Sequence, residues 1–136
     1  PDACLTASSK IAELLNKHKG CKLLYDPVNF ILKRNTDPFI KHWTLLKNFT
    51  AAIDIRDIKI GKGFKPPGMG DSKIANTIKD SIETISTIPA SHFKSGGPCL
   101  WYILEPSLGR RHGQGRTKKD TFGFAVEGLK IILNQI

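Results

Sequence analysis

The sequence predicts an α/β fold in which three parallel strands alternate with helices. Three short apolar runs are each followed by an acidic or charged residue, and segments with helical spacing of apolar residues lie between them. Glycine and proline residues interrupt the chain between these segments. Strands that are separated by helices pair in parallel through right-handed crossovers, so the order α-β-α-β-α-β-α sets the fold class.

The predicted elements follow in order along the chain. A helix over 5–18 has its leucines and isoleucines at near-helical spacing, and Gly20 ends it. A short strand over 21–25 follows, and a turn-forming Asp-Pro pair ends that strand. The next helix covers 38–46 and opens on a proline, which suits the first helical position.

The second half of the chain repeats this alternation. A strand covers 51–58, and a helix with a stripe of isoleucines begins after Asp71-Ser72, which we expect to cap it. A third strand covers 99–104. A polar, glycine-rich loop over about 107–118 then leads to a final helix that begins near Asp120.

Size and composition predict a single domain over 1–136. No apolar run approaches the roughly 18–20 residues that a membrane-spanning helix needs. The first residues do not show the basic and then apolar pattern of a signal peptide. The three cysteines are odd in number and far apart, which favours reduced thiols. We therefore expect a cytoplasmic protein.

The chain is strongly basic. It has 21 Lys and Arg against 12 Asp and Glu, a formal net charge of +9. This charge suits an anionic partner such as a nucleic acid, a phosphorylated metabolite or a membrane surface. The densest basic cluster, within 110–119, lies in the glycine-rich loop and is not interleaved with aromatic residues as a stacking platform would be. A solvated basic surface is the favoured interpretation, with no membrane partner and with nucleic acid as the weaker alternative.

Charged residues end all three predicted strands. They are Asp26, Asp54 with Arg56, and Glu105. The carboxyl ends of parallel strands meet at one pole of the sheet, so we expect these side chains to converge. Converging carboxylates repel one another unless a cation compensates them, and a divalent metal ion with oxygen ligands is the simplest compensation. For Asp54, an ion pair with Arg56 or a neighbouring lysine is an equal alternative.

A loop rich in glycine and proline, 61–71, follows the second strand. Loops after parallel strands are the usual place for ligands in α/β proteins. The loop can close over a sugar or a phosphate, or it can be a rigid turn.

Four motifs occur in series and resemble a known family. They are Tyr25-Asp26-Pro27-Val28-Asn29, Asp54-Ile55-Arg56-Asp57, Pro66-Pro67-Gly68-Met69-Gly70-Asp71 and Ile103-Leu104-Glu105-Pro106. Together they resemble the C-terminal half of the xylose-isomerase-like TIM barrels, the sugar-phosphate isomerase/epimerase superfamily. The resemblance implies a partial (β/α)8 barrel and an isomerase or epimerase that acts on a sugar or sugar phosphate.

The resemblance also implies roles for individual residues. Asp26 and Glu105 match metal ligands, and Glu105 also matches an acid/base carboxylate of the epimerases. Asn29 matches a substrate contact, Arg56 lies where the family usually has lysine, and Lys65 lies in a loop where a basic substrate contact often occurs. Asp54 replaces the usual histidine. Asp54 would then be the third metal ligand, and a carboxylate in that position favours Mg²⁺ or Mn²⁺ over Zn²⁺.

The chain departs from the family in length. A closed barrel has eight strands and about 250 residues, whereas three strands are predicted here. The half that would carry the second acid/base glutamate is absent, so we expect this chain alone to be inactive and to be a fragment or a natural half barrel. Exposed sheet edges predict self-association.

Two other functions stay open at this point. One is a nucleic-acid repair enzyme of the endonuclease IV type on the same fold, although its zinc site needs histidines where this chain has carboxylates. The other is a barrel remnant that binds a ligand or partner without catalysis. Two histidines, His18 and His42, lie on predicted helices, and we expect them at the surface or at the edge of the core. The other two, His92 and His112, lie in predicted loops.

Overall fold

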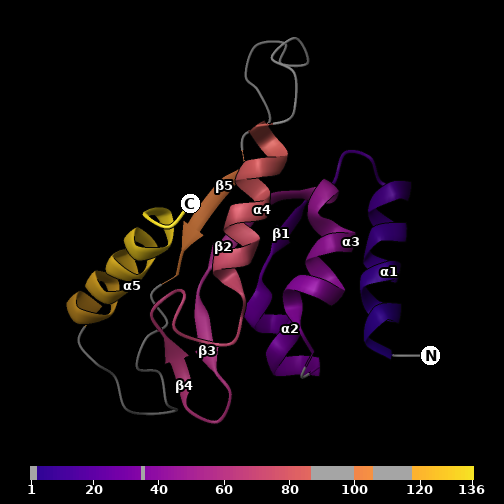
Figure 1. The fold of residues 1–136 in the computed structure, drawn as a ribbon. Coiled ribbons are helices and arrows are strands. Elements are labelled where there is room, and N and C mark those ends of the chain that lie inside the picture. The colour runs from indigo at the N-terminus through magenta and orange to yellow at the C-terminus, as the bar shows by residue number, and fades with distance from the viewer. Residues whose placement is uncertain (1–2, 35, 87–99, 106–117) are drawn as a thin grey trace.

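The computed structural model describes residues 3–34, 36–86, 100–105 and 118–136 (Figure 1). Its centre is a parallel sheet of three strands, β1 (Leu23–Tyr25), β2 (Thr50–Ile55) and β5 (Trp101–Leu104), in the order β1-β2-β5. Helices lie between these strands in the sequence. The predicted α/β class with three parallel strands is therefore confirmed.

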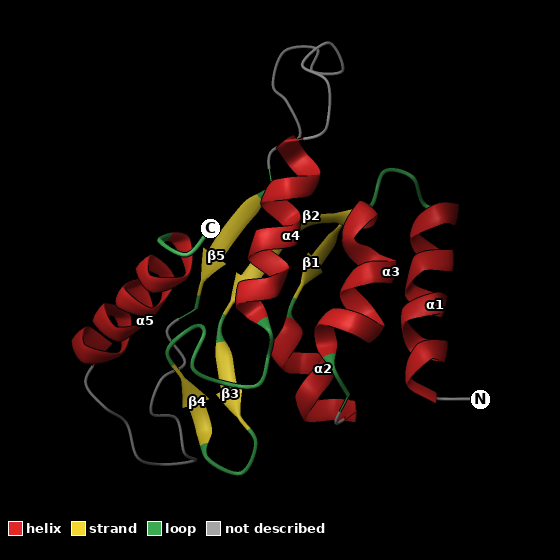
Figure 2. Ribbon diagram, in the orientation of Figure 1, coloured by secondary structure: helices red, strands yellow, loops and turns green. Residues whose placement is uncertain are grey.

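The helices account for most of the remaining described residues. They are α1 (Ala3–Lys17), α2 (Pro27–Arg34), a π-helix (Phe39–Trp43), α3 (Thr44–Leu46), a 3-10 helix (Lys47–Phe49), α4 (Ile74–Ser86) and α5 (Lys118–Leu133). In Figure 2, α4 crosses in front of the sheet, whereas α5 lies beside β5. The predicted helices over 5–18 and 38–46 and after Asp71-Ser72 and near Asp120 all have counterparts, with shifted ends.

Helix α2 was not expected from the sequence. Asp26 Oδ1 accepts hydrogen bonds from the backbone N–H groups of Val28 (2.9 Å) and Asn29 (3.2 Å), which is the role of an N-cap carboxylate. Pro27 is the first residue of the helix, where a missing N–H costs nothing. The Asp-Pro pair, interpreted as a turn, is thus the start of a helix.

The predicted strand over 51–58 is wrong at its end. Strand β2 ends at Ile55, and after Arg56 the chain starts a second strand, β3 (Asp57–Lys59). Strand β3 pairs in antiparallel fashion with β4 (Gly63–Lys65) and not with the central sheet. Part of the glycine-rich loop is therefore a β-hairpin, which lies at the end of the sheet toward which the arrow of β5 points (Figure 2).

The predicted cap of α4 is also wrong. The side chains of Asp71 and Ser72 bind the β3 segment, since Asp71 accepts hydrogen bonds from Lys59 Nζ (2.5 Å) and Ile60 N (2.9 Å). Ser72 Oγ donates to the carbonyl of Arg56 (3.4 Å). Both side chains therefore fasten the loop to the hairpin.

The core joins the helices to one face of the sheet. Its largest buried side chains include Tyr25 of β1 and Trp43, whose rings lie 5.1 Å apart. Tyr25 Oη donates to the carbonyl of Pro38 at 2.5 Å, so the buried hydroxyl is paired. Burial of such a ring contributes about 2–3 kcal/mol.

His42 lies inside this core, and not at the surface or at the edge of the core as predicted. Its side chain is fully buried, stacks on Phe30 with ring centres 4.3 Å apart, and contacts Ser8 Oγ and Thr36 Oγ1 through its two ring nitrogens. His18 is exposed just after α1.

The two faces of the parallel sheet differ. One row of paired residues across the sheet consists of Tyr25, Ile53 and Tyr102. This row faces the helices, because Tyr102 Oη is hydrogen-bonded to Ser81 of α4 at 2.8 Å. The preceding row contains Leu24, 52% exposed, and Trp101, 65% exposed. Side chains alternate along strands, so these apolar residues, like Asp54 and Ile103, lie on the other face.

Several sequence-based predictions lie outside the described residues. These are the glycine break near residue 97, most of the loop over 107–118 with its basic cluster, His92, His112 and Cys99. Cys21 is a free thiol on the surface. None of the described helices is long and apolar enough to cross a membrane.

The exposed apolar residues of the edge strand β5 lead to a prediction of self-association. The weight-average mass of the native chain should rise above 15.1 kDa with concentration in sedimentation experiments. Trp101→Glu should weaken this association, whereas Ile60→Glu, an exposed residue after β3, should not. A native chain that stays monomeric at every concentration would contradict the prediction.

Candidate functional site

Three carboxylates gather around one guanidinium at the carboxyl ends of the parallel strands. Arg56 donates from Nε and Nη2 to both oxygens of Asp26, with Nε 3.3 Å from Oδ1. Its Nε lies 3.3 Å from Asp54 Oδ2, and its Nη1 lies 3.3 Å from Glu105 Oε1. We call these four residues the Arg56 cluster.

The fold explains why these side chains meet. Asp54 and Arg56 are two residues apart at the end of β2, so both side chains lie on the same face. Asp26 follows β1, and Glu105 follows β5 and extends the pairing through its N–H, which donates to Ile55 O at 3.3 Å. The predicted convergence of the three strand ends is confirmed.

The four side chains differ in access to solvent. The exposed fractions are 10% for Asp26, 9% for Asp54 and 15% for Arg56, but 42% for Glu105. Glu105 is therefore the carboxylate of the cluster that a small molecule can reach most easily. Asp26 and Asp54 are shielded from such a molecule.

Burial and an excess of two negative formal charges in the cluster both raise the pKa of Asp54. Burial, followed by a side-chain hydrogen bond with Glu105 and the charges of Asp26 and Glu105, raises the pKa of Asp54 to about 7, although Arg56 lowers it. Asp54 Oδ1 is buried and accepts no hydrogen bond within the described part of the chain. An unpaired buried oxygen costs less on a neutral carboxyl group than on a carboxylate, which agrees with the raised pKa of Asp54.

Arg56 stays charged. Burial lowers its pKa, but the hydrogen bond and charge of Asp26, with the charges of Glu105 and Asp54, outweigh that effect and raise it above the ordinary value. Its guanidinium carbon also lies 5.9 Å from the ring centre of Phe64 in the hairpin strand β4. This contact of Phe64 with Arg56 was not predicted from the sequence. The position of Phe64 among the basic residues of the glycine-rich loop was a weak signal for it.

The two other predicted substrate contacts lie at the same pole but outside the cluster. Asn29 is exposed in the first turn of α2, and its N–H shares Asp26 Oδ1 with Arg56. Lys65 is half-buried at the end of β4, where it pairs with Asp57 in the hairpin register. The structure thus brings Asp26, Asp54, Arg56 and Glu105 together and leaves Asn29 and Lys65 at the rim.

Asp57 organises the loop beside the cluster, a role that sequence reasoning did not assign. Its buried carboxylate accepts hydrogen bonds from the backbone N–H groups of Gly68 (3.0 Å), Gly70 (2.8 Å) and Ser72 (3.0 Å), and from its neighbour Ile58 (2.8 Å). A carboxylate with several N–H donors replaces its lost hydration. The proline-glycine loop is therefore held in one conformation.

The loop also receives helix α5. A Cβ atom at Gly128 of α5 would lie 2.9 Å from atoms of Pro67, so only glycine permits this approach. Ile132, one turn further along, packs into the core. The loop is thus fixed from two sides, by Asp57 and by α5.

The arrangement does not fit the predicted divalent metal ion in the same place. The physical reason is that the Arg56 guanidinium occupies the position between Asp26, Asp54 and Glu105, where a metal ion would meet a positive charge. A Mg²⁺ or Mn²⁺ ion stays a prediction that requires Arg56 to move away.

Comparison with protein-family models, curated proteins and solved structures gave no match to this chain. The resemblance to the xylose-isomerase-like family therefore stays a prediction that depends on the four motifs. The Arg56 cluster itself defines the chemistry of the site.

Gly70→Ala should destabilise the fold through the Asp57 contacts. The added Cβ would overlap Asp57 Oδ1 and lie 2.5 Å from Ile58 O. We expect a loss of about 1–3 kcal/mol in the free energy of unfolding, measured by urea denaturation. Gly20→Ala is the matched control, because no atom lies within 4 Å of its Cβ position. An equal effect of both substitutions would argue against the role of Asp57.

Asp54 should make the stability of the protein depend on pH. Its raised pKa means that the folded chain holds a proton that the unfolded chain releases near its ordinary value, so stability is lost as pH rises. Relative to Asp54→Asn, the native protein should lose roughly 2–4 kcal/mol between about pH 4 and pH 7. The native protein and Asp54→Asn share Asp26, Glu105 and Arg56, so the difference between their pH profiles reports on Asp54. Parallel pH profiles in urea denaturation would contradict the assignment.

Proposed function

We propose that the Arg56 cluster is part of the site of a sugar or sugar-phosphate isomerase or epimerase. The observation that carries the proposal is a partly exposed carboxylate, Glu105, 3.3 Å from a charged guanidinium, Arg56, that is 15% exposed. A base beside a fixed cation can remove a proton from carbon and stabilise the negative oxygen that forms. The choice of a sugar as substrate comes from the resemblance of the motifs.

We also propose that the parallel sheet is part of a (β/α)8 TIM barrel, with 1–136 forming its C-terminal part. The arrangement of the two sheet faces supports this. One face packs against the helices, whereas the other presents Leu24, Trp101 and the Arg56 cluster. In a closed barrel, that second face points inward and the carboxyl ends of the strands form the active site.

The chemistry assigns each residue a task. Glu105 takes a proton from the carbon beside the substrate carbonyl, and the C–H electrons form the C=C bond of an enediolate. Arg56 stabilises the resulting negative oxygen. Return of the proton to the former carbonyl carbon, with transfer of the hydroxyl proton from the oxygen of the first carbon to the enediolate oxygen, gives the isomer. Return of the proton to the opposite face of the first carbon, with the carbonyl restored, gives the epimer. The second carboxylate that epimerisation needs would come from the rest of the barrel.

The other cluster residues hold this pair in place. Asp26 binds both Nε and Nη2 of Arg56 and so sets the plane of the guanidinium. Asn29 and Lys65, at the rim, are proposed contacts for the hydroxyl or phosphate groups of the substrate. A divalent metal ion would polarise the substrate carbonyl, but no step is assigned to it because Arg56 lies in its place.

Non-catalytic ligand binding is the second candidate function. The specific observation in its favour is that Arg56 pairs with all three carboxylates within the chain. Such a network can serve a structural role without catalysis, and its partly exposed Glu105 and its excess of negative charge leave it able to bind a cationic or hydroxyl-bearing ligand. An endonuclease IV-type function has no such support, because His42 lies in the core between Ser8 and Thr36 and His18 is exposed just after α1.

Proton abstraction can be measured directly in heavy water. We expect deuterium to enter the carbon beside the carbonyl of a ketose or ketose phosphate, followed by proton NMR. Glu105→Gln should slow this exchange by at least about 100-fold, the usual contribution of a general base. Glu127→Gln, an exposed residue of α5 paired with Lys130, is the matched control.

The assays use the purified 136-residue chain and, in parallel, the protein encoded by its complete coding sequence. Exchange that is unchanged in Glu105→Gln would refute the assignment of the base. Binding of the sugar without any exchange in either preparation would establish the non-catalytic alternative instead.

A further inference from the structure

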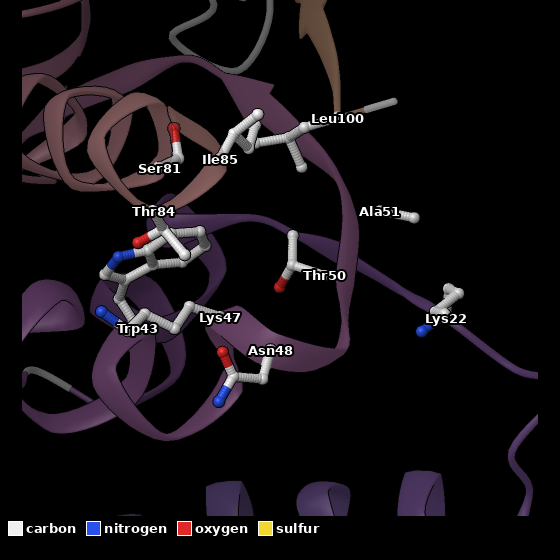
Figure 3. Close-up of a pocket in the computed structure, with 10 residues that line it drawn as sticks. All are labelled: Lys22, Trp43, Lys47, Asn48, Thr50, Ala51, Ser81, Thr84, Ile85 and Leu100. Carbon is white, nitrogen blue, oxygen red and sulfur yellow. The ribbon is translucent and has the colours of Figure 1, made fainter. Parts of the chain in front are cut away.

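A pocket lies at the opposite end of the parallel strands from the Arg56 cluster, and we propose that it binds a small molecule with a flat apolar body and one anionic group, such as an aromatic carboxylate (Figure 3). Its lining includes Lys22 just before β1, Thr50 at the start of β2 and Leu100 just before β5. Thr50 and Arg56 are six residues apart along an extended chain, which separates the two sites by about 20 Å.

The size of the pocket selects the class of ligand. Its volume is about 280 Å³. A cavity of about 150 Å³ holds one benzene ring, so this pocket has room for two fused rings. The walls are predominantly apolar, with Trp43, Ile85 and Leu100 from three separate segments. In Figure 3, the indole of Trp43 and the side chains of Ile85 and Leu100 border the space around Thr50.

The charge of the pocket favours an anion. Two lysines line it, Lys22 and Lys47. Within the described part of the chain, Asp80 is the carboxylate that pairs with them, through Lys47 at 3.2 Å. Among the described residues, one positive charge is therefore in excess at the pocket, and the ammonium group of Lys22, on a flexible stem, can reach a carboxylate at the mouth of the pocket.

The polar groups around the pocket are held by the fold. Asp80 Oδ2 accepts a hydrogen bond from Trp43 Nε1 (2.8 Å) as well as from Lys47, so it fixes both side chains. Thr50 Oγ1 donates to Leu46 O at 3.0 Å, and Ser81 Oγ donates to Ile78 O at 2.6 Å. A ligand therefore meets a wall that is already ordered, which lowers the entropic cost of binding.

The aromatic carboxylate 2-naphthoate is a suitable probe, with the neutral 2-naphthamide as its isostere. The chain has two tryptophans, so the two indole N–H signals report binding in a ¹H–¹⁵N NMR titration, and Trp101→Phe assigns them. We expect 2-naphthoate to shift the Trp43 signal saturably and to leave that of Trp101, on the exposed edge strand, unchanged.

Two substitutions separate the charge from the cavity. Lys22→Gln should weaken 2-naphthoate about tenfold, as the loss of one charge-assisted hydrogen bond predicts, and should leave 2-naphthamide unaffected. Ala51→Leu, which adds bulk to the wall, should weaken both probes. Lys62→Gln, in the exposed turn between β3 and β4, is the control and should change neither.

Two results would overturn the proposal. One is the absence of saturable binding of 2-naphthoate up to about 10 mM, the range of the weakest specific affinities. The other is an equal affinity for the carboxylate and the amide, which would remove the anionic part of the claim. The sugar chemistry proposed for Glu105 does not enter either measurement, so the two proposals fail independently.

Discussion

The contact of Arg56 with three carboxylates is the interaction on which the rest of the site depends. Without a cation, Asp26, Asp54 and Glu105 would repel one another at the point where three strands end. Two unit charges 4 Å apart attract by about 4 kcal/mol near a protein surface, and desolvation and solvent screening offset much of this gain, most of all at the partly exposed Glu105. Burial and the remaining excess of negative charge raise the pKa of Asp54 to about 7, so that protonation of Asp54 relieves the excess below that pH.

The adjacent residues Arg56 and Asp57 have different roles, one in the charge cluster and the other in the loop. Successive side chains of an extended segment point in opposite directions, so Arg56 reaches the carboxylates while Asp57 binds the N–H groups of the loop. The carbonyl of Arg56 accepts the Ser72 hydroxyl, which joins the two networks. The end of β2 therefore positions the charged groups and the loop beside them, and a substitution in either network should affect both.

Sequence patterns predicted the three parallel strands and the convergence of Asp26, Asp54 and Glu105, because both follow from the alternation of apolar runs with helices. They did not identify the compensating cation, since an ion pair of Asp54 with Arg56 and a metal ion were equally consistent with the residues. Helix α2 was missed because Asp-Pro serves both turns and helix starts. The pocket beside Trp43 could not be predicted, because several distant segments form its walls.

The central claim is that Arg56 provides the cation of this site. It is tested most directly by calorimetric titration of Mn²⁺ into the native chain and into Arg56→Met. The account predicts no saturable binding to the native cluster and the appearance of binding in Arg56→Met, which adding Glu105→Gln removes, because carboxylates without a guanidinium attract a divalent ion. Tight Mn²⁺ binding to the native chain that Glu105→Gln abolishes would contradict the account.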